Sequence, residues 1–162
     1  MVPARILVEG FERNMQLIRD RTEGLTHAES LVQTPYRVNC LNWTLGHILH
    51  ARGPVLDLLG VPRVVPAAET ERYGRDSEPV VEDGPGVLRM EDLLDRLEET
   101  QARITDALEG VDEAALAVIT DKGDGTRAPL GELIHYRLFH DTFHTAHTDI
   151  LRQVALAGRR EA

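Results

Sequence analysis

The sequence is poor in cysteine and in long hydrophobic runs, and both shortages limit what the protein can be. Cys40 is the only cysteine among 162 residues, so no disulfide can form within the chain. A chain of this kind is typical of a reducing compartment. No apolar run is long enough to span a bilayer, and acidic Glu9 interrupts the N-terminus before a signal-peptide hydrophobic region could form. We therefore expect a cytoplasmic protein without a membrane partner.

Positive charge is scarce as well. Lysine occurs once, as Lys122, and the formal net charge is -9. No cluster of basic residues offsets this balance, which argues against a nucleic-acid partner or an anionic membrane surface. Aromatic residues make up only 4% of the chain, but 42% hydrophobic and 28% charged residues are ordinary for a globular protein. By its length the chain is expected to form a single domain over residues 1–162.

Hydrophobic residues at helical spacing predict four long helices. Asn42 suits the N-cap of the second helix, and Pro129 suits the first turn of the fourth. A capping-box pattern beginning at Thr26 predicts a short helix between the first two. The long helices are expected at residues 3–23, 42–59, 88–109 and 129–156.

The segment 61–87 is rich in proline and glycine, which forbid long regular elements there. A connection of this length is usually functional or mobile. Only 62–65 and 79–81 carry weak strand signals, and 116–128 is expected to be a loop with a tight turn at 121–125. The sequence therefore predicts an all-α fold: a four-helix bundle with a long connection between helices 2 and 3.

Three histidines lie close together in the fourth predicted helix. His140, His144 and His147 are spaced by four and three residues, so they share one helix face. Burying several imidazoles costs free energy unless each is hydrogen-bonded or ligated, and neutral imidazole is a common metal ligand. The pattern indicates a metal site on an inward-pointing face, which continues through Leu133, Tyr136, Leu151 and Val154.

A second histidine pair, His47 and His50, lies in the second predicted helix. Gly46 precedes His47, and a small residue there lets neighbouring backbone or a ligand approach closely. A third imidazole from a facing helix would complete a three-histidine site. Such a site leaves coordination positions for water or substrate, as catalytic metal sites do.

Two segments resemble the signature regions of the DinB/YfiT-like superfamily. They are Asn-Trp-Thr-Leu-Gly-His at 42–47 and His-Asp-Thr-Phe-His-Thr-Ala-His at 140–147. The order of the helices, the Tyr-Gly-Arg sequence at 73–75 and the Ile-Leu-Arg-Gln sequence at 150–153 add to the similarity. The resemblance implies a four-helix bundle that binds a divalent metal ion through three histidines. By position these correspond to His47, His140 and His144.

The sequence departs from the commoner pattern of this family at His147, where many relatives have glutamine. His147 could be a fourth ligand, a hydrogen-bond donor behind the ligands or a proton shuttle, and His50 raises the same question. We expect both to lie behind the three ligands. Imidazole ligation suits Zn²⁺, Ni²⁺, Mn²⁺ and Fe²⁺, so the sequence does not select the metal.

Other candidate residues are weaker. Cys40 could pair with a histidine as a nucleophile, but a buried thiol that packs as a small hydrophobic group is the simpler interpretation. Tyr136 and Trp43 are expected in the core or as walls of a pocket beside the metal. His135 points away from the histidine face, and His27 is expected at the surface.

An open three-histidine site favours a metal-dependent enzyme, in which the metal acts as a Lewis acid or lowers the pKa of a bound water or thiol. The resemblance implies thiol transfer or isomerisation with a low-molecular-weight thiol such as mycothiol or bacillithiol; hydrolysis is a further reaction type. The alternative is a non-catalytic bundle of the stress-response type that binds metal or a small molecule. Similar bundles often dimerise through apolar helix faces, so a homodimer is expected.

Overall fold

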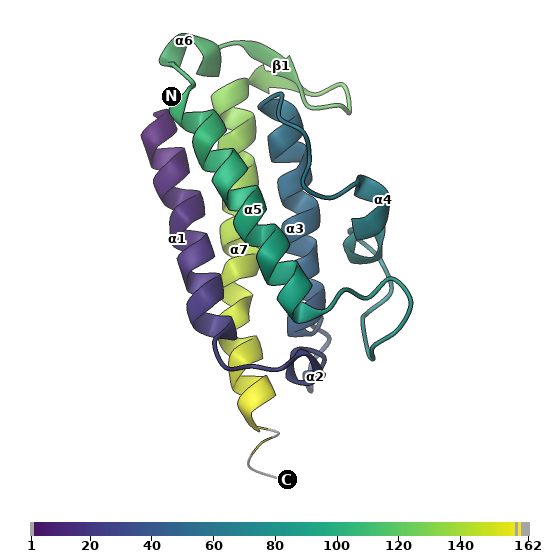
Figure 1. Cartoon of the computed structure of the whole chain (residues 1–162). Helices are drawn as coiled ribbons and strands as arrows, with labels where there is room; N and C mark the ends of the chain where they lie inside the picture. Colours follow the sequence, from purple (N-terminus) through teal and green to yellow (C-terminus); the bar gives the residue numbers. More distant parts are fainter. Residues whose placement is uncertain (1, 158, 160–162) are drawn as a thin grey trace.

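Four long helices run side by side in a computed structural model that describes residues 2–157 and 159 (Figure 1). Helices α1 and α3 each pack against both α5 and α7. The prediction of a mostly helical chain is confirmed. The long helices are α1 (Ala4–Thr22), α3 (Leu41–Leu58), α5 (Met90–Glu109) and α7 (Leu130–Ala157).

Helices α1 and α7 run in one direction, and α3 and α5 run in the opposite direction (Figure 1). The starts of α3 and α5 lie together, since the Asn42 side chain donates to the Leu88 carbonyl. Residues 59–89 must therefore return along the length of the helices between the end of α3 and the start of α5. This segment contains α4 (Ala67–Thr70) and the 3₁₀ helix η1 (Glu71–Tyr73), so it is not devoid of regular structure.

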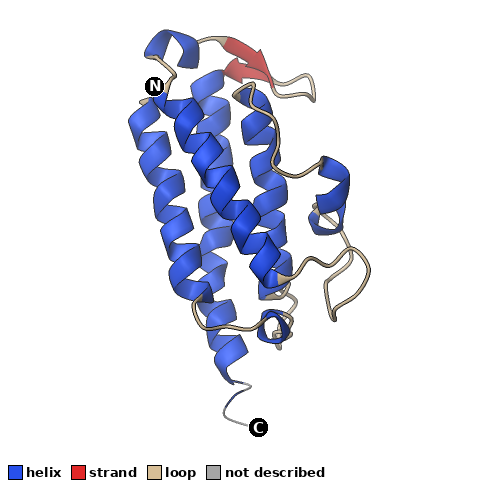
Figure 2. Ribbon diagram, viewed as in Figure 1, coloured by secondary structure: helices blue, strands red, loops and turns tan. Residues whose placement is uncertain are grey.

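A short β-hairpin precedes α7 (red in Figure 2). After α6 (Glu113–Leu116), strand β1 (Ile119–Asp121) pairs antiparallel with β2 (Arg127–Pro129). The prediction of a plain loop at 116–128 was wrong at these strands, although the tight turn between them is present. The turn forms because the Asp121 and Asp124 carboxylates accept from the N–H groups of Gly123 and Thr126.

The apolar core follows the predicted helical spacing on α1 and α5. Leu7, Phe11, Met15 and Ile18 of α1 are fully buried. So are Leu93, Leu97, Ile104 and Leu108 of α5. Burial of such side chains is the main driving force that holds the long helices together.

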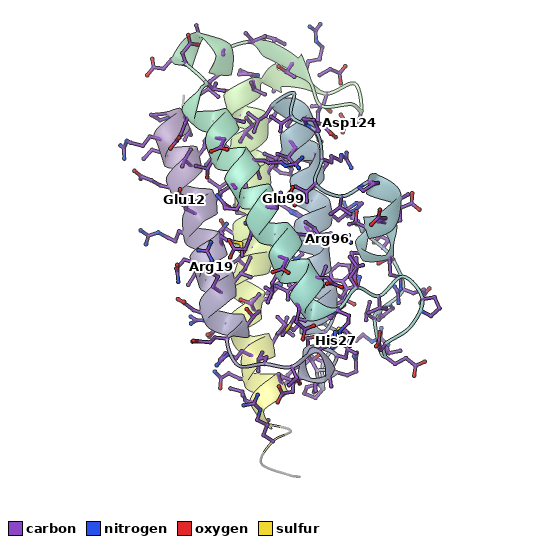
Figure 3. The ribbon with its side chains drawn as sticks, viewed as in Figure 1. Glu12, Arg19, His27, Arg96, Glu99 and Asp124 are labelled. Carbon is purple, nitrogen blue, oxygen red and sulfur yellow. The ribbon has the colours of Figure 1, made fainter. Side chains whose placement is uncertain are left out.

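Charged side chains cover the outer faces of the helices (Figure 3). Arg19 of α1 forms an ion pair with Glu98 of α5, and Arg96 of α5 contacts Glu69 of α4 at 3.1 Å. The side chains of both pairs are partly exposed to solvent. Among the described residues, no helix is both long and apolar enough to cross a membrane.

Helix α3 begins at Leu41, and its N-cap is Cys40, two residues before the predicted N-cap Asn42. Asn42 lies inside the first turn and is fully buried. Its amide donates to the Leu88 carbonyl, and its oxygen accepts from the Tyr73 hydroxyl. The polar side chain that suggested a cap therefore ties α3 to the returning segment.

Candidate metal centre

Helices α3 and α7 bring three histidines together. His47 comes from α3, and His140 and His144 are one turn apart on α7. One ring nitrogen from each histidine lies within 4.8 Å of those from the other two. The Nε2 atoms of His47 and His140 are 3.3 Å apart. The His144 ring centroid lies 4.4 Å from that of His47 and 4.5 Å from that of His140. These are the three residues that the family resemblance singles out.

The backbone of η1 fixes the orientation of His47. Its Nδ1 lies 2.7 Å from the carbonyl oxygen of Tyr73. A carbonyl oxygen only accepts, so Nδ1 carries the proton and donates it. The neutral ring then presents the lone pair of Nε2 to the other two histidines. This is the arrangement by which a hydrogen bond behind a metal-binding histidine sets its tautomer and its direction.

Gly46 makes room for this contact. A Cβ atom at Gly46 would lie 2.2 Å from the Tyr73 ring. The phenol of Tyr73 is fully buried, where its hydroxyl donates to Asn42 and accepts from the N–H of Leu88. The group that approaches Gly46 closely is thus the Tyr73 ring. The backbone carbonyl of the same residue orients His47.

Trp43 forms one wall of the site. Its ring stacks on His47 at 4.6 Å between centroids and 10° between planes. Its Nε1–H donates to the Ser77 hydroxyl at 3.0 Å. His47 is therefore held on its face by a flat apolar ring and at its edge by a carbonyl.

All three histidines are kept neutral. Burial lowers the pKa of His144 to about 3, and the neighbouring histidines add to this effect. Burial also lowers the pKa values of His47 and His140. Neutral imidazole is the protonation state that binds a metal ion, so the site is prepared for one at neutral pH.

The donor set fits a divalent metal ion. Zinc–nitrogen bonds of 2.0–2.1 Å in a tetrahedron place two nitrogens about 3.3 Å apart, which matches the Nε2 separation of His47 and His140. The buried Nδ1 of His140 has no hydrogen-bond partner among the described residues. The Nε2 atoms of His47 and His140 face each other. Burying their lone pairs unused costs free energy, and a bound ion would compensate for this cost.

A pocket of about 420 Å³ opens beside the three histidines. The segment 59–89 supplies Arg75, Asp76 and Ser77 to its lining, and Asn39 and Trp43 complete it. A larger groove between α1 and α5 is lined by none of these residues. A small molecule can therefore reach the three histidines through this pocket.

The structure places His147 and His50 near the three histidines but outside the group that converges. His147 is half-buried, with its ring 5.7 Å from that of His144 and 4.7 Å from Phe143. The Nδ1 of His50 lies 3.0 Å from the Thr70 hydroxyl, which itself donates to Ala67. His50 therefore donates to Thr70 and joins α3 to α4.

Two expectations about surface and core were wrong. His27 is only 5% exposed, because its Nδ1 accepts from the N–H of Met90, a donor that the first turn of α5 leaves free. Tyr136 is 56% exposed instead of lying on a buried stripe. The face of α7 that points inward carries Asp141, Thr145 and Thr148 between its apolar residues.

The remaining candidates lie away from the chemistry. His135 is exposed and lies outside the three-histidine group, as expected from its position on the helix. Cys40 is fully buried with its thiol 3.2 Å from the Val80 carbonyl, and burial raises its pKa. A neutral buried thiol is a poor nucleophile, which favours the packing role over the nucleophilic one.

The sequence matches the DinB superfamily over residues 11–147, so this chain belongs to the DinB superfamily, as the resemblance predicted. No curated protein matches the sequence. Among solved structures, the fold is similar to that of a conserved protein from Enterococcus faecalis, with a TM-score of 0.73 and 16% identity. That likeness covers 97% of this chain and 99% of the other, and it concerns the fold alone.

Proposed function

We propose that this protein binds a divalent metal ion through His47, His140 and His144 and acts on a small molecule in the adjoining pocket. The main observation that supports this proposal is that three neutral imidazoles, from two helices, converge beside a pocket of about 420 Å³. The bound metal would supply Lewis acidity and lower the pKa of a coordinated water or thiol. Zn²⁺, Ni²⁺, Mn²⁺ and Fe²⁺ all suit this donor set.

Residues around the three histidines orient them and keep them unprotonated. The Tyr73 carbonyl and the Trp43 ring hold His47 in one tautomer and one orientation. The imidazoles stay unprotonated because the surrounding packing excludes water from them. Three protein ligands leave coordination positions open, which favours chemistry over a purely structural role.

The pocket suits a small polar substrate. Its volume lies in the usual range for small-molecule sites, and its lining includes the Arg75 cation, the Asn39 amide and the Trp43 ring. A low-molecular-weight thiol with anionic or amide groups matches these features, so the proposed reaction is thiol transfer or isomerisation, with hydrolysis as a further type. Non-catalytic binding of metal or a small molecule is the alternative.

The proposal also covers the architecture. The four long helices would form the DinB-type four-helix bundle as one domain over residues 1–162, with residues 59–89 as the long connection. That segment would select the substrate, since it supplies Arg75, Asp76 and Ser77, three of the five residues that line the pocket besides the histidines.

Elemental analysis tests the metal site directly. Untagged protein purified without chelators should contain about one divalent ion per chain, and His144→Ala should lose it. His135→Ala is the matched control, because His135 lies exposed on the same helix outside the cluster. Wild-type protein that remains metal-free after titration with Zn²⁺, Ni²⁺ and Mn²⁺ would refute the proposal.

Cobalt substitution then tests the substrate class. Co²⁺-loaded protein should develop a sulfur-to-cobalt charge-transfer band when a small thiol enters the open position. An unchanged spectrum would reject thiol coordination while leaving metal binding intact. Turnover of thiol with an electrophile separates an enzyme from the non-catalytic alternative.

A further inference from the structure

A tight turn beside the three histidines contains the one described non-glycine residue with a positive φ angle. We call residues 74–77 the pocket turn; the N–H of Ser77 closes it by donating to the Gly74 carbonyl at 3.3 Å. The third residue of the turn, Asp76, has a φ of 63°, whereas glycine or asparagine usually occupies this position. Side chains in the left-handed region are sterically disfavoured, and such residues cluster at functional sites.

The fold gives no structural reason for an aspartate at this position. The Asp76 side chain is 89% exposed, and among the described residues its carboxylate has no partner besides Arg75. The two charged groups are 3.7 Å apart, which exceeds hydrogen-bond distance. The Arg75 side chain is 91% exposed and likewise has no other partner in the described part of the chain. Both groups can therefore bind a ligand without breaking a contact that the fold needs.

The backbone of the pocket turn is held in place on both sides. Just before the turn, the Tyr73 carbonyl accepts from His47, and at its end the Ser77 hydroxyl accepts from the Nε1–H of Trp43. The Arg72 guanidinium closes the same loop by donating to two backbone carbonyls beyond the turn. The two charged side chains of the turn therefore extend from a backbone with a fixed position relative to the candidate metal centre.

Arg75 and Asp76 are the charged side chains of the pocket lining, since its three histidines are neutral. They carry opposite charges and are adjacent in the turn. A purely anionic ligand is attracted by Arg75 but repelled by Asp76, and a purely cationic ligand meets the reverse combination. A ligand that carries both charges side by side is attracted by both residues.

We propose that Arg75 and Asp76 bind the carboxylate and the ammonium of a free α-amino-acid group and thereby select the ligand of this pocket. The inference rests on the proposed function, because it names the substrate class of the same site. An α-amino acid carries both charges on one carbon, which matches two adjacent residues of a turn. Arginine suits the carboxylate, because its planar guanidinium can donate two parallel hydrogen bonds. The side chain of the ligand, such as a thiol, then remains available to reach the three histidines.

Fluorescence of Trp43 reports binding, since Trp43 lines the pocket and is the only tryptophan of the chain. Four thiols separate the two charges: cysteine carries both, 3-mercaptopropionate only the carboxylate, cysteamine only the ammonium, and 2-mercaptoethanol neither. Zinc-loaded wild-type protein should bind cysteine more tightly than each of the other three. Equal affinities for the four thiols would overturn the inference and leave the proposed function standing.

Two substitutions assign the charges to residues. Asp76→Asn keeps the turn, because asparagine also adopts positive φ angles, and it should weaken the binding of cysteine and cysteamine. Arg75→Gln should weaken the binding of cysteine and 3-mercaptopropionate. Each loss should be about two- to fivefold, the range for exposed charge pairs, and neither variant should change the binding of 2-mercaptoethanol. Chelation of the zinc ion by thiolate and amine would also favour cysteine, but it would not respond to Asp76→Asn. An unchanged cysteine affinity in this variant would therefore overturn the inference.

Glu78→Gln is the matched control for Asp76→Asn. It removes the same charge from an exposed position of the same segment, outside the pocket lining, and it should bind all four thiols as the wild type does. A loss of cysteine affinity in Glu78→Gln equal to that in Asp76→Asn would show a general charge effect and overturn the assignment of Asp76.

Serine and metal-free protein separate this inference from the proposed function, because serine has the amino-acid group without the thiol. Millimolar serine should change the Trp43 fluorescence, and the response should weaken in Asp76→Asn. This result would support the inference even if the protein took up no metal and the proposed function failed. A response to neither serine nor cysteine, with or without zinc, would overturn the inference.

The Asp76 carboxylate should also be dispensable for folding. Asp76→Gly should be at least as stable as the wild type in urea, because glycine adopts positive φ angles without steric cost. Its affinity for cysteine should fall as in Asp76→Asn. A clear loss of stability would show that the aspartate supports the turn itself, which would contradict its assignment to a ligand.

Discussion

Arg52 of α3 and Asp141 of α7 form an ion pair that is almost completely removed from water. The Nε–Oδ2 distance is 2.7 Å and the Nη2–Oδ1 distance is 3.2 Å, and both residues are at most 2% exposed. Asn14 of α1 donates to the same carboxylate, and Gln101 of α5 accepts from Arg52. One polar residue from each long helix therefore meets at this point.

This network fixes α7 relative to α3, because the charges pair in only one register of the two helices. Asp141 directly follows the candidate ligand His140, and Arg52 lies five residues after His47. The same register that pairs the charges brings His47 opposite His140. Arg52 and Asp141 are thus positioning residues for the candidate metal centre.

Removal of one partner should be strongly destabilising. Asp141→Ala leaves the Arg52 guanidinium buried without its counter-charge, and we expect the free energy of unfolding to fall by about 3–5 kcal/mol. Urea unfolding measures this loss. The double variant Arg52→Met with Asp141→Leu should recover most of the stability, since it removes both charges and keeps the volume. A loss below about 1 kcal/mol in Asp141→Ala would mean that the pair is not shielded as described.

Gly46→Ala should damage the metal centre through Tyr73. The new Cβ would lie 2.2 Å from the Tyr73 ring, so the ring and the carbonyl that holds His47 must move. Overpacking of this kind costs about 1–3 kcal/mol, and zinc affinity, measured by competition with a chromophoric chelator, should fall at least tenfold, as is typical when the support behind a ligand is lost.

Gly84→Ala is the control for this variant, because no atom lies within 4 Å of a Cβ built there. We expect its stability and its zinc affinity to match those of the wild type. Undiminished zinc affinity in Gly46→Ala would show that the Tyr73 carbonyl does not orient His47.

Acid should weaken the contact between the short helix α2 (His27–Ser30) and the C-terminal end of the chain. The Arg159 guanidinium, together with the Thr26 N–H, lowers the pKa of Glu29 to about 2. Because the folded pKa lies below that of the unfolded chain, the carboxylate stabilises the fold above about pH 4.5. This contribution is lost as the pH falls from there toward 2.

The Glu29→Gln variant tests this dependence in thermal unfolding. Its melting temperature should lie below that of the wild type at pH 7, and the two should converge near pH 2, where Glu29 becomes protonated in both states. Arg159→Gln should show the same convergence, since it removes the principal donor. A gap of constant size across this pH range would contradict the assignment.

Much of the candidate site could be predicted from the sequence. Histidines four residues apart on a helix share a face whatever the rest of the fold does, so His140 and His144 follow from local geometry. The choice of His47 as their partner rested on the family resemblance. The role of the Tyr73 carbonyl could not be predicted from the sequence beyond the Tyr-Gly-Arg motif. Every residue has a backbone oxygen, and only long-range packing decides which one contacts His47.

The sequence misled most on α7. The sequence predicts Tyr136 on an inward face because it continues the line of His140, His144 and His147 along the helix. Here the inward face contains Asp141, Thr145 and Thr148, and Asp141 is paired by Arg52 and Asn14. Because these buried polar side chains occupy the inward face of α7, aromatic residues lie on its exposed face instead. His27 was misjudged for a related reason, since its burial depends on an N–H group of α5.

The segment 59–89 contacts the candidate centre in two ways: the Tyr73 carbonyl orients a ligand, and Arg75, Asp76 and Ser77 line the pocket. Val65, Tyr73 and Val80 of this segment belong to the core that it shares with α3 and α5, but Arg75, Asp76 and Ser77 do not. Selection could therefore rewrite the chemistry of this protein by altering one surface segment while the helices remain constant. A change in this segment that displaces the Tyr73 ring from Gly46 would alter both metal affinity and substrate choice. The two properties are therefore expected to evolve together.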